Sequence, residues 1–135
     1  MKVHHIGYLV DDINSAINEF ERLGYTRQTS LLYDSVRQFH AIFIMNNGYV
    51  LELLQPTNKD SSIWGLRKRF KNSPYHICYS TFDIEAETMN LCAKGHTLLD
   101  PIRTVHELEG KPRISFLFSP QIGIIELMES GDSHV

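Results

Sequence analysis

The chain has 135 residues and a formal charge of −3, which allows one compact domain or two fused half-size repeats and excludes a large multidomain assembly. Hydrophobic residues make up 42% of the sequence and charged residues 21%, and this balance favours a packed core over disorder. The 13 Lys and Arg residues are outnumbered by 16 Asp and Glu residues, so the basic excess that neutralises nucleic-acid phosphates is missing.

Neither a targeting segment nor a cysteine framework is predicted. The apolar stretch over residues 6–10 ends at Asp11 and Asp12 and is too short for a signal core, and no stretch approaches the ~20 apolar residues of a membrane span. Cys78 and Cys92 are the only cysteines and form no CxxC pair, so we expect reduced, mostly buried thiols. The expected protein is cytoplasmic and binds neither nucleic acid nor membranes.

The first half begins with a strand that includes residues 3–8 and continues with the clearest helix. Asp12 suits the N-cap of this helix and Gly24 its C-terminal stop. The apolar stripe between them has helical spacing and consists of Ile13, Ala16, Ile17, Phe20 and Leu23. Three strand-like runs follow, over residues 25–32, 36–45 and 49–55, with Asn46-Asn47-Gly48 as a hairpin turn.

The second half repeats the first. His76 aligns with His5 at an offset of 71 residues, and the match continues without a gap. The aligned segments are Val3–Tyr8 with Pro74–Tyr79, Asp12-Ile13 with Asp83-Ile84, Gly24 with Gly95, and Thr26 with Thr97. The two halves are therefore expected to share one plan.

The elements of the second half follow from this alignment. A helix is expected from Asp83 to Lys94, with a weaker stripe because Thr88 lies between Ile84 and Leu91. The segment from Pro101 to Pro112 is expected to be a loop. Strands are predicted over residues 96–99, 113–118 and 122–128.

The predicted fold class is α+β, with two βαβββ modules forming a curved mixed sheet around a metal-binding cleft. Residues 1–135 are expected to form a single domain. Its internal modules span about 1–55 and 74–130, and the linker over residues 56–73 is expected to hold a short helix.

Four residues stand out as candidate metal ligands. His5 and His76 occupy equivalent strand positions, and Glu52 and Glu126 each interrupt an apolar run near the end of a half. A carboxylate inside such a strand costs several kcal/mol to bury unless it is paired or coordinates a cation. Two imidazoles and two carboxylates suit a divalent metal. The alternative is that each His is a satisfied strand residue and each Glu lies at an exposed edge.

The residues around these four positions resemble the vicinal oxygen chelate superfamily, which contains glyoxalases, bleomycin-resistance proteins and dioxygenases. The resemblance covers nearly the whole chain and is closest to the branch of glyoxalase I and methylmalonyl-CoA epimerase. The motifs that carry it are His-His-Ile-Gly-Tyr-Leu-Val-Asp-Asp-Ile, Leu-Glu-Leu-Leu-Gln-Pro, Tyr-His-Ile-Cys-Tyr and Gly-Ile-Ile-Glu-Leu-Met. It implies that His5, Glu52, His76 and Glu126 bind one divalent metal ion, with nickel, cobalt or zinc favoured.

The resemblance also implies a lyase or isomerase that moves a proton next to a metal-bound carbonyl. Glu126 or Glu52 would act as the base. The substrate would be a small thiol-linked molecule, either a glutathione hemithioacetal or an acyl-CoA, and the protein would be a homodimer.

The sequence supports a glyoxalase I-like and an epimerase-like activity almost equally. Methylmalonyl-CoA epimerases often carry a further glutamate before the third strand, where this chain has Tyr33-Asp34-Ser35-Val36, so Asp34 would have to replace it. Leu-Leu-Gln-Pro after Glu52 favours the epimerase side. The alternatives are a non-catalytic, drug-sequestering binding protein of the same fold, against which the intact set of four ligands argues, and an iron dioxygenase, which uses one carboxylate rather than two.

Three further features carry weaker hypotheses. Four basic residues in the linker could bind a CoA phosphate or a glutathione carboxylate. Such a run is more often a solvated face. The four residues are Arg67, Lys68, Arg69 and Lys71. His40 is a candidate for the cleft lining, although a lone His in such a strand is more often simply packed. Cys78 is expected to be a small filler beside His76.

Overall fold

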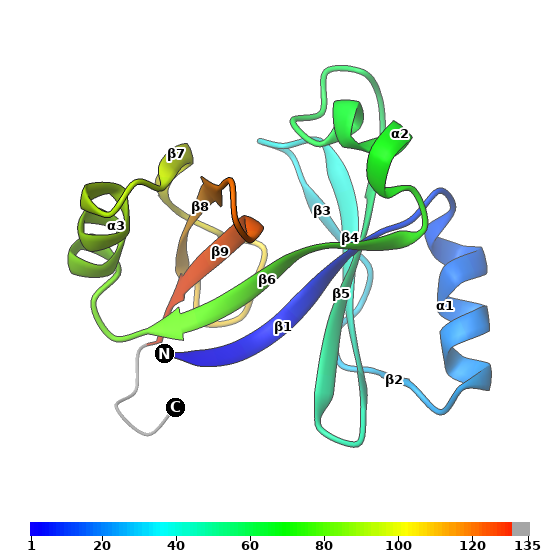
Figure 1. Ribbon diagram of the computed structural model, residues 1–135. Helices are drawn as coiled ribbons and strands as arrows, with labels where there is room; N and C mark the ends of the chain where they lie inside the picture. Colours follow the sequence, from blue (N-terminus) through cyan, green and yellow to red (C-terminus); the bar gives the residue numbers. More distant parts are fainter. Residues whose placement is uncertain (131–135) are drawn as a thin grey trace. The chain divides into compact units, whose positions relative to one another are not determined.

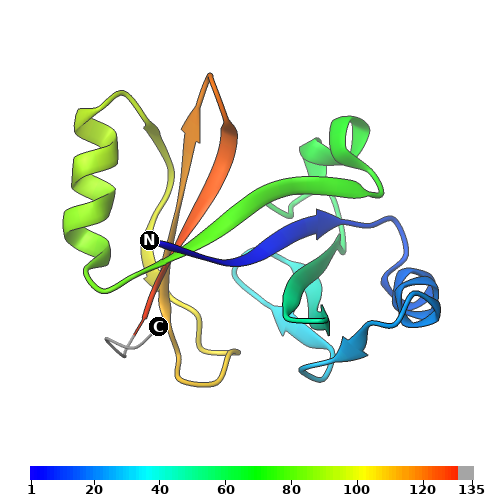
Figure 2. The same ribbon diagram turned by 60° about the horizontal axis from the view of Figure 1, so that its bottom comes forward.

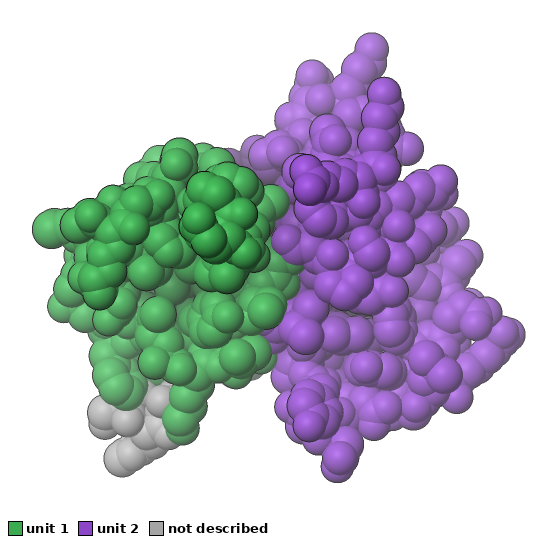
Figure 3. Space-filling view, in the orientation of Figure 1, with its two compact units in different colours: residues 1–4, 76–135 green, residues 5–75 purple. Residues whose placement is uncertain are grey.

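The computed structural model of the chain describes residues 1–130 and divides into two compact units. Unit 1 consists of residues 1–4 and 76–135, and unit 2 of residues 5–75 (Figure 3). The nine strands of the described residues belong to one mixed sheet, and each unit has its own helix and its own hydrophobic cluster.

Unit 2 contains the first βαβββ module. Its sheet order is β2-β4-β5-β1, with β3 paired to β4. Strands β1 and β5 are parallel, and the other pairs are antiparallel. The elements are β1 (Lys2–Leu9), α1 (Ile13–Arg22), β2 (Thr26–Arg27), β3 (Leu32–Asp34), β4 (Phe39–Asn46) and β5 (Tyr49–Pro56).

Helix α1 lies along one face of this sheet (Figure 1). The Asp12 side chain accepts a hydrogen bond from the Ser15 backbone N–H at 3.0 Å, which caps the helix as predicted. Gly24 follows the helix at a φ of 101°, a value that L side chains rarely adopt. Ile13 and Ile17 are buried against β4 and β5, and Ala16 and Phe20 pack on the same cluster, so the predicted helix is confirmed. The predicted stripe is wrong at Leu23, which is the C-cap and is 70% exposed.

The strand predicted over residues 25–32 is wrong, because the structure has two short strands there, β2 and β3. Between them the Thr29 hydroxyl accepts a hydrogen bond from the Phe43 N–H. The next predicted strand begins at Phe39 instead of Val36. Asp34 holds the preceding segment in a turn that ends at Gln38, whose φ is 57°.

The linker contains a short helical segment, as expected. A single turn, η1 (Trp64–Leu66), leads directly into α2 (Arg67–Phe70). Ile63, directly before this segment, is buried, and the Phe70 and Tyr75 rings are in contact at a centroid distance of 6.3 Å.

Unit 1 contains the second βαβββ module. Its sheet order is β6-β9-β8-β7, with β6 parallel to β9 and the other pairs antiparallel. Helix α3 packs against this sheet (Figure 2). The elements are β6 (Ser73–Thr81), α3 (Ile84–Ala93), β7 (Thr97–Thr104), β8 (Arg113–Ser119) and β9 (Gly123–Glu129).

The apolar stripe of α3 is weak because one of its sheet-facing positions makes a polar contact. Asp83 caps the helix through the Ala86 N–H at 3.0 Å. Thr88 faces the sheet, and its hydroxyl makes a 3.0 Å hydrogen bond with that of Ser115, which is fully buried on β8. A polar pair therefore takes the place that an apolar contact would fill, and the predicted helix is confirmed.

The loop predicted from Pro101 to Pro112 is wrong over its first four residues, which belong to β7. This strand continues through irregular register with β8 between Leu98 and Arg103, so its side chains do not alternate cleanly. The rest of the segment does form a loop. Val105 and Leu108 of this loop pack on a cluster that includes Cys78.

The α+β class with two βαβββ modules is confirmed. Among the described residues there are nine strands rather than eight, because β3 is additional. In each module the helix covers one face of the sheet and leaves the opposite face for other side chains. None of the described helices has the length and apolar character needed to cross a membrane.

Candidate metal centre

In unit 2 the structure brings His5 and Glu52 together. Gly7 of β1 pairs with Glu52 of β5. Side chains alternate along a strand, so His5, two residues before Gly7, lies on the same face as Glu52. The His5 Nε2 is 3.3 Å from Glu52 Oε1, and the His5 side chain is fully buried.

In unit 1 the structure builds the same pair from the equivalent strands. Cys78 of β6, which aligns with Gly7, pairs with Glu126 of β9. His76 lies two residues before Cys78, and its Nε2 is 3.1 Å from Glu126 Oε1. The side chains of His76 and Glu126 are 0% and 5% exposed. Each unit thus supplies one imidazole and one carboxylate, with the nitrogen and an oxygen side by side.

These donor pairs fit a divalent metal ion. Metal–nitrogen and metal–oxygen bonds are about 2.0 to 2.2 Å long. When the donor–metal–donor angle lies between the values for square and tetrahedral coordination, the two donor atoms are roughly 3 to 3.5 Å apart. The 3.3 Å and 3.1 Å separations lie within that range. Both glutamates are also flanked by apolar residues in their strands, and a carboxylate in such surroundings needs a cation or a hydrogen-bond donor.

Asp34 lies on the same face of the unit 2 sheet as Glu52, but its carboxylate has a structural task. It pairs with Phe39 of β4, and Phe43, on the same face of that strand, pairs with Glu52. Asp34 Oδ1 accepts hydrogen bonds from the N–H groups of Val36 and Arg37 at 3.0 Å and 2.9 Å. This oxygen therefore caps the turn into β4.

His40 does not face the side of the sheet that carries Glu52. It pairs with Gln55 and lies on the face of β4 that also carries Ile42, which packs against α1. Its ring contacts Tyr33 at 5.1 Å. The interpretation of His40 as a packed residue agrees with this position.

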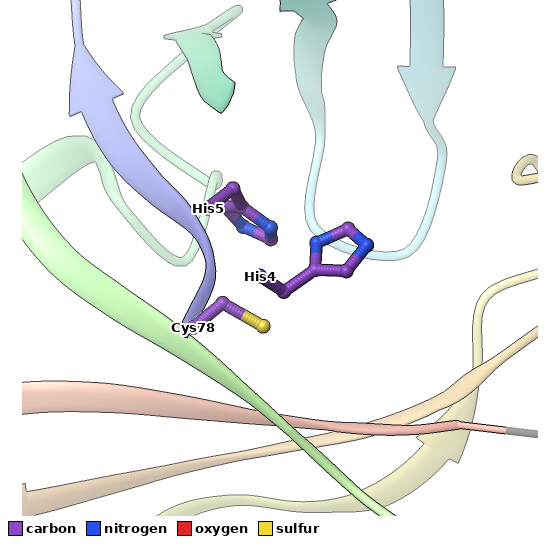
Figure 4. Close-up of side chains that lie close together, drawn as sticks. All are labelled: His4, His5 and Cys78. Carbon is purple, nitrogen blue, oxygen red and sulfur yellow. The ribbon is translucent and has the colours of Figure 1, made fainter. Parts of the chain in front are cut away.

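Cys78 is fully buried in a cluster with Val105, Ile114 and Met128, which suits the expected filler. Its thiol also lies close to His4, the residue that precedes His5 in the chain (Figure 4), within 4.8 Å of a His4 ring nitrogen. The sequence pattern does not predict this neighbour, because His4 and Cys78 are not equivalent in the repeat.

The basic residues of the linker are exposed or half-buried, and one of them is paired with an acid. The Arg67 guanidinium lies over the Trp64 ring at 3.9 Å, and Lys71 contacts Asp11 at 3.3 Å. Lys68 and Arg69 are exposed, and neither has an acidic partner among the described residues.

The sequence of the chain matches a known family. The model of the glyoxalase/bleomycin resistance protein/dioxygenase superfamily matches residues 4–129. Because the match spans nearly the whole chain, the protein belongs to this superfamily, as the resemblance predicted. No match is found among curated proteins.

Solved structures show the same fold. A methylmalonyl-CoA epimerase from Mycobacterium tuberculosis has a TM-score of 0.80 at 18% identity, over 98% of this chain and 90% of that one. A variant of the Streptomyces coelicolor methylmalonyl-CoA epimerase, in complex with 2-nitronate-propionyl-CoA, has a TM-score of 0.79 at 25% identity, over 97% and 95%. A hypothetical protein from Bacillus halodurans has a TM-score of 0.82 at 18% identity, over 98% and 96%.

Proposed function

We propose that the protein is a metal-dependent isomerase of the methylmalonyl-CoA epimerase type, which moves a proton next to the carbonyl of a thiol-linked acyl substrate. The observation that carries this proposal is the duplicated His–Glu pair, at 3.3 Å in unit 2 and 3.1 Å in unit 1. In the proposed site both pairs, His5 with Glu52 and His76 with Glu126, hold one divalent ion, with nickel, cobalt or zinc favoured. When bound, the ion supplies Lewis-acid stabilisation of the enolate charge.

The glutamates supply the acid–base chemistry. The Glu52 side chain is 13% exposed and that of Glu126 is 5% exposed, so Glu52 is the carboxylate with more room to move. In the proposed reaction the Cα–H bond breaks, its proton goes to a Glu52 oxygen, and its electron pair moves towards the carbonyl oxygen. A solvent water delivers a proton to the opposite face of the planar carbon, which inverts the centre, and Glu52 releases the abstracted proton to the hydroxide that is left. Glu126 and the two imidazoles hold the site.

The linker favours coenzyme A over glutathione as the carrier. Arg67, Lys68 and Arg69 present three positive charges on one short turn, which suits a carrier that bears several phosphate groups. Arg67 is already ordered over Trp64. The structural resemblance to epimerases, one of them in complex with a CoA compound, also supports this choice.

A glyoxalase I-type activity on a glutathione hemithioacetal is the second candidate. The observation that favours it is the structural role of the Asp34 carboxylate. Asp34 is the residue that would have to replace the further glutamate of epimerases, and its Oδ1 accepts two backbone hydrogen bonds. Without a separate base, a single metal-site glutamate would take the proton and return it to the neighbouring carbon.

The decisive experiment measures solvent deuterium incorporation into methylmalonyl-CoA by cobalt-loaded or nickel-loaded protein, with a chelated sample as control. We expect metal-dependent exchange, a wild-type stoichiometry of about one metal per site, and at least tenfold lower occupancy in His5→Ala.

No exchange by a metal-replete sample would refute the epimerase, and turnover of methylglyoxal with glutathione would then establish the second candidate. Wild-type metal content in His5→Ala would refute the proposed site. If the wild type binds no metal, a binding protein of the same fold becomes the better hypothesis.

Two further expectations stay predictions. The protein is proposed to be a homodimer, which light scattering coupled to size-exclusion chromatography tests. It is also proposed to be cytoplasmic, which cell fractionation tests.

A further inference from the structure

We propose that Phe43 and Phe116 are a matched pair of positioning residues, which hold the imidazoles of His5 and His76 in the orientation needed to bind the metal. This inference rests on the proposed metal site and adds two residues to it. Neither phenylalanine is proposed to touch the metal or the reacting atoms.

The contacts are nearly identical in the two units. The Phe43 and His5 rings have centroids 5.1 Å apart and planes at 85°. The Phe116 and His76 rings have centroids 5.2 Å apart and planes at 90°. Both pairs are therefore perpendicular ring contacts, a geometry that aromatic rings favour.

The sheet register explains why the same contact forms twice. Phe43 of β4 lies directly opposite Glu52 of β5, and Phe116 of β8 lies directly opposite Glu126 of β9. Each histidine comes from the strand on the other side of that glutamate strand. Every unit thus contains a triplet of histidine, glutamate and phenylalanine from three adjacent strands, on the face of the sheet away from the helix.

Packing alone does not require this repetition. Many apolar side chains fill a strand position opposite a glutamate, and the helix-facing sides of the two sheets have indeed diverged. In unit 2 the buried cluster between α1 and the sheet is apolar, whereas in unit 1 the buried contact between α3 and β8 includes the hydrogen-bonded Thr88 and Ser115. The aromatic contact is kept where the proposed metal ligands are, and this is the feature that points to a role in the site.

The physical role is control of the histidine χ2 angle. The torsion that rotates an imidazole about its Cβ–Cγ bond has broad energy wells, so packing decides where the ring nitrogens point. A perpendicular phenyl ring restricts this rotation while Nε2 lies beside the glutamate oxygen. A ligand that is already oriented loses less entropy when the metal binds, as is found for groups that orient metal-ligating histidines.

The test replaces each ring by an aliphatic side chain and measures metal affinity directly. We expect Phe43→Leu and Phe116→Leu each to weaken Co²⁺ binding about tenfold, in a competition titration against a chelating dye, and the double variant to weaken it about a hundredfold. The visible absorption bands of the bound Co²⁺ should also shift, since they report ligand geometry. The melting temperature of each metal-free variant shows that it is folded.

Phe20→Leu is the matched control in unit 2. Phe20 makes perpendicular contacts with Tyr8 and Tyr25 at 5.2 Å each, on the helix side of the same sheet. This variant should lower the melting temperature and leave the Co²⁺ affinity and absorption bands unchanged.

The outcomes separate the positioning role from the site itself. Wild-type affinity and bands in both Leu variants would overturn the positioning role while leaving the metal site intact. Equal weakening by Phe20→Leu would show a general loss of stability and would also overturn it. A wild-type protein that binds no Co²⁺ would overturn the proposed function and, with it, this inference.

Discussion

The two units share one order of strands and helix, but they resemble each other more closely on the face away from the helix than on the helix side. On the face away from the helix, the histidine, the glutamate and the phenylalanine recur with ring contacts of 5.1 Å and 5.2 Å. On the helix side, α1 packs through Ile13 and Ile17, whereas α3 places Thr88 against Ser115. The helix starts differ too, since the first turn of α3 carries two glutamates and that of α1 carries no acidic residue.

This difference separates what the fold needs from what the site needs. Any side chains that fill the space between helix and sheet preserve the fold, so that interface can exchange apolar contacts for a hydrogen bond. A metal site fixes both the residue types and their distances. Conserved geometry on one face and divergence on the other is therefore what a functional site on a duplicated scaffold would produce.

The largest expected effect concerns the two glutamates, which differ in exposure. Glu126→Gln should lower Co²⁺ affinity by about a hundredfold, because a buried carboxylate leaves no room for a replacing water. Glu52→Gln should keep more metal but lower the deuterium exchange rate by about 10³-fold, since it removes the proposed base. Metal titrations and exchange assays on both variants check this, with Glu19→Gln, at an exposed position of α1, as control. The reverse pattern would assign the base to Glu126.

The second prediction compares the two helix interfaces through their stability. Ile17→Ala should lower the free energy of unfolding by about 2–4 kcal/mol, because Ile17 is 2% exposed in an apolar cluster. Thr88→Ala should cost about 1–3 kcal/mol, mainly because the buried Ser115 hydroxyl loses its partner. Urea denaturation measures both values. The double variant Thr88→Val, Ser115→Ala should recover most of the second loss, and no recovery would contradict the hydrogen-bond explanation.

The third prediction decides what Asp34 does. Asp34→Ala should destabilise the protein by about 1–2 kcal/mol, because the N–H groups of Val36 and Arg37 lose their acceptor. Asp34→Asn keeps an accepting oxygen, so it should retain stability and keep the exchange rate within about threefold of wild type. Denaturation curves and exchange assays on the two variants test this. If Asp34→Asn is stable but loses exchange, Asp34 is a base as well as a cap.

Much of the fold could be predicted because its signals are local. The caps at Asp12 and Asp83 and the hairpin at Asn47 and Gly48 depend on nearby backbone groups, and the structure contains all of them. The error at residues 25–32 arose because the break depends on a long-range hydrogen bond from the Phe43 N–H to the Thr29 hydroxyl. The extension of β7 beyond Leu99 likewise depends on its pairing with β8.

The histidine and glutamate positions were predictable for a different reason. Polar side chains in apolar strands stand out, and the repeat linked them across the chain. Phe43 and Phe116 gave no such signal, because a phenylalanine in a strand is ordinary. Their role depends on sheet register, which sets them opposite Glu52 and Glu126, and on ring orientation, which the sequence pattern does not contain.

The smallest expected effect is the pH dependence of an ion pair that joins α3 to the strands of unit 1. Arg113 of β8 donates hydrogen bonds to Glu85 in the first turn of α3 and to Glu129 of β9, the latter at 2.8 Å. The hydrogen bonds from Arg113 hold the pKa of Glu85 below its usual range, and the two carboxylates raise the pKa of Arg113.

Because the pKa of Glu85 is lowered by folding, the pair stabilises the protein above the ordinary carboxyl pKa, and this contribution is lost as the pH falls through the lowered value. The melting temperature of wild type should therefore exceed that of Glu85→Gln slightly at about pH 7, and the difference should vanish at about pH 2. Added salt should also reduce it, since the pair is exposed. A difference that persists at low pH would mean that Glu85 stabilises α3 by packing instead of charge.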